Sequence, residues 1–107
     1  MIKVALGGRV DPPTRVDSVT LNAGENRLWC AAIDRLDGYA YFGTYDSVGI
    51  VVKVALGGGA SAPTRVGALT LSAGANFLRC VALDAVRDYA DFGTDTEPAR
   101  VIKVALG

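Results

Sequence analysis

The sequence contains no histidine, and this absence excludes more chemistry than any other feature of its composition. Histidine is the commonest general base and a frequent metal ligand, so catalytic pairs and triads that depend on it are excluded. There are only two cysteines, Cys30 and Cys80, which are too few and too far apart for a zinc site built within one chain. The composition therefore argues against an enzyme, and no metal or cofactor is predicted.

The chain also lacks a charge excess and a long apolar run. Its 11 basic and 11 acidic residues cancel, so no basic surplus is available to bind phosphates, and nucleic acid is a poor candidate partner. No run approaches the roughly 18 apolar residues of a membrane span, and the N-terminus has no signal-peptide pattern. No membrane association is expected, and no compartment is predicted.

What is present is a repeat. The segment Lys-Val-Ala-Leu-Gly occurs at 3–7, 53–57 and 103–107, and shifting the chain by 50 residues aligns 1–57 with 51–107 without a gap. Of these 57 aligned positions, 30 are identical. Because tandem repeats of this length indicate a repeat architecture, the 107 residues are interpreted as one two-repeat unit.

Each repeat predicts four short strands and no helix. The expected strands are 28–33, 39–42, 50–56 and 64–71, with an Asp-Gly hairpin signal at 37–38. Four strands in a tandem unit of about 40–50 residues are typical of a β-propeller blade.

The middle strands resemble those of a known propeller class. Tyr-Ala-x-Phe-Gly-Thr occurs at 39–44 and 89–94, and Val-x-Lys-Val-Ala-Leu follows each copy. This order is similar to that of the YVTN-type and surface-layer propeller repeats, over nearly the whole chain. The resemblance implies an all-β fold of four-stranded blades, although such propellers usually carry all their blades in one chain and this chain has two.

The order of the strands suggests how two blades could form a ring. With the strands of a blade named A to D from the axis outward, the chain reads C-D (from residue 2), A-B-C-D (28–71) and A-B-C (78–106). The D strand that is missing at the end is present at the start, at 14–21, so copies of the chain could close a propeller by swapping strands. We expect the partner to be the chain itself, with three copies favoured and four as the alternative.

One strand is redundant in this scheme. The C strand occurs at both ends, at 2–6 and 102–106, although the ring needs it once per copy. One of the two must therefore fray, pair at an outer edge or displace the other, and the sequence does not indicate which.

Several side chains could carry chemistry, but a structural interpretation is favoured for each. Cys30 and Cys80 could form a ring of reactive thiols, yet free cysteine commonly serves as a small buried apolar residue. The turn residues Asp34, Asp84 and Asp37 are expected to cap backbone N–H groups. Trp29 is replaced by Arg79 in the second repeat, which marks a packing variant or a ligand-facing position.

The best candidate surface is formed by loops. In a propeller the D–A and B–C loops emerge on the same face, where ligands are often bound. Amides, carboxylates and aromatic rings suit a carbohydrate ligand, although solvated turns use the same residues. The predicted ligand-binding residues are Asn22, Glu25, Asn26, Trp29, Tyr45, Asp46, Asn76, Asp95, Thr96 and Glu97.

Three functional hypotheses follow. The first is a self-assembling propeller module with a structural or ligand-binding role, with a glycan or small molecule as the ligand of a lectin-like site. The alternative is a fragment or engineered piece of a longer propeller with no function of its own. The third is a hydrolase with a composite Asp/Glu site, which the absence of histidine and of a metal motif disfavours.

Overall fold

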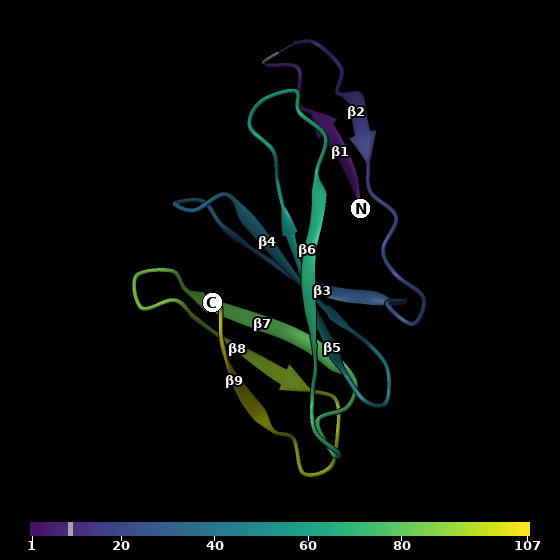
Figure 1. Ribbon diagram of the computed structural model, residues 1–107, viewed down its shortest axis with the longest axis vertical. Coiled ribbons are helices and arrows are strands. Elements are labelled where there is room, and N and C mark those ends of the chain that lie inside the picture. Colours follow the sequence, from purple (N-terminus) through teal and green to yellow (C-terminus); the bar gives the residue numbers. More distant parts are fainter. Residues whose placement is uncertain (9) are drawn as a thin grey trace.

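The computed structural model describes residues 1–8 and 10–107, and these residues form nine antiparallel strands and no helix (Figure 1). The all-β expectation is confirmed. In chain order the strands are β1 (Ile2–Ala5), β2 (Thr14–Ser18), β3 (Leu28–Asp34), β4 (Tyr39–Thr44), β5 (Ile50–Ala55), β6 (Thr64–Thr70), β7 (Leu78–Asp84), β8 (Tyr89–Thr94) and β9 (Val101–Ala105).

The strands form three sheets with the orders β1-β2, β3-β4-β5-β6 and β7-β8-β9. In Figure 1 the four-stranded sheet lies between the other two. Each strand overlaps its predicted range, but β2 ends at Ser18 and not at Leu21. The reason is that its partner β1 is short. Beyond Ser18 the pairing ends with Met1, whose carbonyl accepts the Val19 N–H at 2.9 Å. The described residues of one chain form three separate sheets and do not close a ring.

The main core lies between the second and third sheets. Leu78 and Phe92 are fully buried there, and Tyr41, Val51 and Val104 pack with them. On β5 successive residues point to opposite faces, and Val51, Val52 and Val54 are all buried. This explains the nearly continuous β-branched sequence of β5, because a strand covered on both faces does not alternate between apolar and polar residues.

The repeated Phe-Gly-Thr segment has a structural explanation. A Cβ added to Gly43 would lie 2.7 Å from the Cys30 sulfur, and one added to Gly93 would lie 2.6 Å from the Cys80 sulfur, so a larger residue at either position would force the cysteine side chain to move. The buried Thr44 then accepts the N–H of Ile50 at 2.9 Å. Thr94 accepts the N–H of Arg100 at the same distance. Each threonine therefore holds the loop that follows it.

The outer strand pairs share one register. β1 pairs with β2 through Val4↔Arg15, with a bulge between Lys3 and Val4. β5 pairs with β6 through Val54↔Arg65, with a bulge between Lys53 and Val54. The two-stranded sheet thus reproduces the outer half of the four-stranded one, 50 residues earlier, while among the described residues no strand of this kind lies beside β9.

Candidate functional site

Three aromatic rings meet where the second and third sheets join. The ring centroid of Tyr45 lies 4.8 Å from that of Trp29 and 5.0 Å from that of Phe77. Trp29 stands on β3, Tyr45 directly follows β4, and Phe77 directly precedes β7. Trp29 remains 53% exposed, so this aromatic surface is accessible in the single chain.

Two charged side chains of the second repeat complete the group. The Tyr45 hydroxyl donates to Asp95 Oδ2 at 2.6 Å, and Arg79 Nη1 lies 3.3 Å from the same oxygen. The Arg79 guanidinium also lies 5.7 Å from the centroid of the Trp29 ring. The hydrogen bond to the Asp95 carboxylate raises the pKa of Tyr45. We call Trp29, Tyr45, Phe77, Arg79 and Asp95 the loop-face cluster.

The structure thus brings together three of the predicted ligand-binding residues, namely Trp29, Tyr45 and Asp95. Phe77 was missed, although the replacement of Arg27 by Phe77 between the repeats was a signal that could have indicated it. The sequence indicated Arg79 only as the residue that replaces Trp29 in the second repeat, and not as a ligand-binding residue.

The other predicted residues have separate partners. Glu25 accepts a hydrogen bond from Arg65 Nε at 2.8 Å, and this bond, with one from the Asn22 N–H, lowers the pKa of Glu25 against the effect of its burial. Asp46 lies 3.6 Å from Arg27. Thr96 shares a hydrogen bond with Thr94 at 2.6 Å. Outside these contacts, Asn26 and Glu97 are exposed and Asn76 is half-buried.

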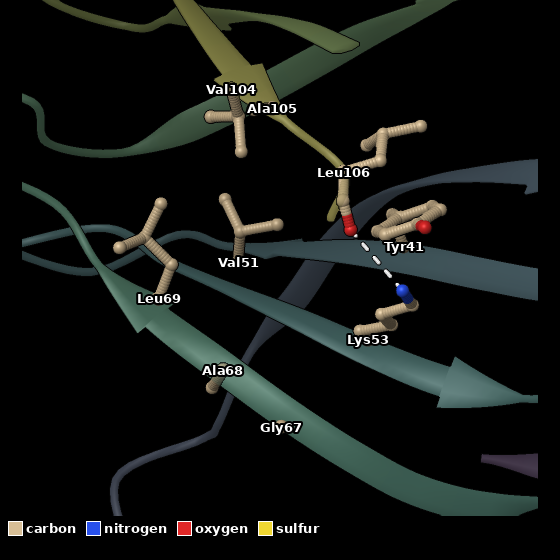
Figure 2. A pocket seen from close by; sticks show the side chains of 9 residues that line it. All are labelled: Tyr41, Val51, Lys53, Gly67, Ala68, Leu69, Val104, Ala105 and Leu106. Carbon is tan, nitrogen blue, oxygen red and sulfur yellow. Dashed lines mark hydrogen bonds between the residues drawn. The ribbon is translucent and has the colours of Figure 1, made fainter. Parts of the chain in front are cut away.

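A groove runs between β6 and β9. Its volume is about 210 Å³. In Figure 2, Leu69 and Val51 point across it toward Val104, and its other wall is the end of the chain, Ala105 and Leu106. The outer edge of β9 borders this groove and pairs with no strand in the described part of the chain. The groove is therefore an apolar slot beside an open sheet edge.

The lysines of the repeated Lys-Val-Ala-Leu-Gly segments link neighbouring sheets. Lys53 Nζ donates to the Leu106 carbonyl at 3.2 Å, as Figure 2 shows, and lies 4.3 Å from the centroid of the Tyr39 ring. Lys3 Nζ donates to the carbonyls of Leu56, Gly57 and Ser61 at 3.1, 2.8 and 2.7 Å. These lysines have a structural role at successive sheet junctions.

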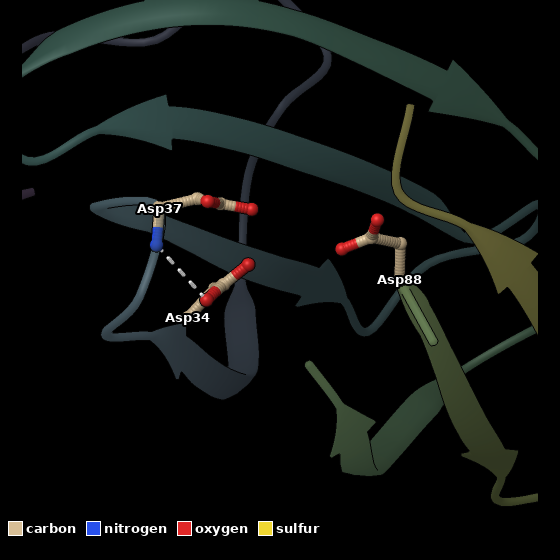
Figure 3. Close-up of side chains that lie close together, drawn as sticks. All are labelled: Asp34, Asp37 and Asp88. Carbon is tan, nitrogen blue, oxygen red and sulfur yellow. Dashed lines mark hydrogen bonds between the residues drawn. The ribbon is translucent and has the colours of Figure 1, made fainter. Parts of the chain in front are cut away.

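Three carboxylates approach one another at the hairpin turns, as Figure 3 shows for Asp34, Asp37 and Asp88. Asp34 is buried, and its Oδ1 accepts the N–H groups of Leu36 and Asp37 at 3.1 and 3.2 Å. Asp84 caps the equivalent turn by accepting the Arg87 N–H at 3.2 Å. The predicted capping role of Asp34 and Asp84 is confirmed, whereas Asp37 contributes its backbone N–H to the turn.

Both cysteines are free thiols in the structure. Cys30 is half-buried against Gly43, and burial is the main cause that raises the pKa of its thiol. A raised pKa disfavours the reactive thiolate. The structure therefore supports the packing interpretation of Cys30.

No family model, curated protein or solved structure matches this chain. Among the described residues, no helix is long and apolar enough to cross a membrane.

Proposed function

We propose that the chain is a self-assembling β-propeller module whose copies complete one another by exchanging strands, with three copies in the ring. The observation that carries this proposal is the pair of incomplete sheets. The third sheet ends at the open edge of β9, whereas β2 has the sequence and register of the strand that would pair there. In the assembly, β2 of one copy would pair with β9 of another and fill the groove beside β6.

Burial at repeat-equivalent positions supports this assembly. Val51 is 4% exposed because the third sheet covers it, whereas Val101, its counterpart on β9, is 77% exposed. Leu78 is fully buried against the second sheet, while its counterpart Leu28 is only half-buried. A further copy would cover Val101 and Leu28 as the chain itself covers Val51 and Leu78, and burial of large apolar side chains favours association.

The solution mass tests this proposal. Light scattering coupled to size exclusion should give about three times the mass of one chain, with four as the alternative ring size. A well-folded monomer at micromolar concentration would contradict the proposal.

A second candidate function is ligand binding at the loop face, favoured by the exposed Trp29 beside Asp95 and Arg79. An exposed indole ring with nearby charged hydrogen-bonding groups suits an amphipathic ligand such as a sugar, and repetition around a ring would add avidity. The loop-face cluster of one chain contains a single carboxylate, Asp95, whereas glycoside hydrolysis uses a pair, so a hydrolase site would need a second carboxylate from another copy.

A glycan and metabolite screen tests this second function. Trp29→Ala should weaken any binding that the screen finds and leave the mass of the assembly unchanged. If the screen returns no ligand, a fragment of a longer propeller becomes the better interpretation of the loop face.

A further inference from the structure

Two backbone hydrogen bonds join the second sheet to the third at the loop face. The Phe77 N–H donates to the Asp46 carbonyl at 2.9 Å, and the Gly49 N–H donates to the Ala75 carbonyl at 2.8 Å. Through these bonds the loop before β7 lies against the loop after β4. They hold Phe77 beside Tyr45.

The repeat equivalent of the Phe77–Asp46 contact is not made within the chain. Shifted by 50 residues, the pair Phe77 and Asp46 becomes Arg27 and Thr96. Arg27 already has the backbone conformation of Phe77, with φ of 49° against 54°, a left-handed region that non-glycine residues seldom adopt. Among the residues that the structure describes, no acceptor is found for the Arg27 N–H. In the chain order, the sheet before Arg27 is β1-β2, which in the described residues has no counterpart of β4 and of the loop after it, so a second copy is needed to bring Thr96 to Arg27.

The same shift replaces an aromatic pair with an ionic one. Phe77 corresponds to Arg27, and Tyr45 corresponds to Asp95. We propose that the junction between copies is closed by a salt bridge from Asp95 of one copy to Arg27 of the next, at the place where Tyr45 and Phe77 pack inside the chain. This inference rests on the proposed function, since it requires that the copies associate as the repeats do.

Both charged side chains are accessible for this role. The Arg27 side chain is 69% exposed and lies at a loose 3.6 Å from Asp46. The Asp95 side chain is 46% exposed and is approached by Tyr45 and Arg79 of its own chain. A carboxylate can accept several hydrogen bonds, so a second guanidinium can reach Asp95 without displacing the Tyr45 hydroxyl.

The proposal gives the ring a direction. The junction inside each chain is aromatic and the junction between chains is ionic, so each copy would associate only head to tail, with its Asp95 end facing the Arg27 end of the next. Charge repulsion also disfavours the incorrect head-to-head and tail-to-tail arrangements, because two Arg27 ends or two Asp95 ends would bring like charges together.

Charge reversal tests the pair. Asp95→Arg and Arg27→Asp should each raise the dissociation constant of the assembly by about a hundredfold, because like charges then face each other at every junction. The double variant should recover most of the wild-type affinity. A matched control is Asp46→Ala, which removes the present partner of Arg27 and should leave the assembly unchanged. Recovery in the double variant separates the pair from a folding role of Asp95, which reversal at position 27 could not restore.

The possible failures are distinguishable. A monomeric wild-type chain would overturn the proposed function itself. An assembled wild type whose mass and affinity survive both single reversals would overturn only the salt bridge, and so would single variants that weaken assembly without rescue in the double variant.

Mixing the two single variants adds a test of ring size. Alternating copies would place opposite charges at every junction of a four-membered ring, whereas a three-membered ring must keep one mismatched junction. Full recovery on mixing therefore indicates four copies, and partial recovery indicates three. No recovery at all would contradict the pairing.

Discussion

Tyr45 and Asp95 occupy the same position in the two repeats, yet they touch, since the Tyr45 hydroxyl donates a 2.6 Å hydrogen bond to the Asp95 carboxylate. Equivalent residues of neighbouring sheets can meet in this way because the loops after β4 and β8 lie side by side at the sheet junction. This contact depends on the difference between the repeats at this position. Two tyrosines or two aspartates could not form a hydrogen bond between a neutral donor and a charged acceptor.

The bond makes a prediction about tyrosine ionisation. The Asp95 carboxylate raises the pKa of Tyr45 by accepting its hydrogen bond and repelling the phenolate. Asp95→Asn removes the charge, so one tyrosine should ionise at lower pH than in the wild type. Absorbance at alkaline pH would follow the titration, with Tyr45→Phe identifying the residue. A titration curve that is the same with Asp95 and with Asn at this position would show that the bond is not formed in solution.

Gly49 and Ala99 occupy equivalent positions in the two repeats, and exchanging glycine and alanine at them should have opposite effects. A Cβ on Gly49 would lie 2.7 Å from Leu78 Cγ and 3.1 Å from the Ala75 carbonyl oxygen. Gly49→Ala should therefore destabilise the chain by about 1–3 kcal/mol through overpacking, measured by urea unfolding.

Ala99 would meet Leu28 of the next copy at the corresponding place in the proposed ring. Its Cβ must force this junction slightly open, so Ala99→Gly should tighten the assembly and lower its dissociation constant. Weaker assembly of this variant would contradict the equivalence of the two junctions.

The ion pair of Glu25 and Arg65 predicts a dependence of stability on pH. The Arg65 hydrogen bond holds the pKa of Glu25 below its ordinary value of 4.5. A lowered folded-state pKa means that the pair stabilises the fold above pH 4.5 and that this contribution is lost as the pH falls through the folded-state pKa. Glu25→Gln should therefore unfold at a lower temperature than the wild type at pH 7, and the difference should shrink in acid. A difference that persists at the lowest pH would rule out the charge as its cause.

The strands could be predicted from the sequence because each is short, apolar and bounded by turn residues, and because the repeat supplies every pattern twice. Phe77 could not be placed beside Tyr45 in the same way, since this contact depends on the spacing and tilt between two sheets. The partner of Glu25 was also missed, because its salt bridge to Arg65 depends on the path of the loop after β2. Asp88 joins Asp34 only through the packing of two separate hairpins.

The last prediction concerns the two equivalent C strands at the ends of the chain, residues 2–6 and 102–106. The sequence did not indicate which of them pairs in the ring, but in the structure the two strands differ in burial. Val104 and Leu106 are 6% and 7% exposed in the core beside Tyr41. Their counterparts in the N-terminal copy, Val4 and Leu6, are 44% and 81% exposed. In the proposed ring, β9 of one copy would replace β1 of the next, and Lys103 would take over the carbonyl contacts that Lys3 makes.

Deleting residues 1–6 should therefore leave the assembly intact, and it should even favour the ring by removing the strand that competes for β2. Deleting residues 102–107 should destabilise the chain by several kcal/mol, since two buried aliphatic side chains are lost, and should abolish the assembly. Size exclusion with light scattering and urea unfolding would measure both effects. Equal tolerance of the two deletions would show that β9 is not the strand that pairs between copies.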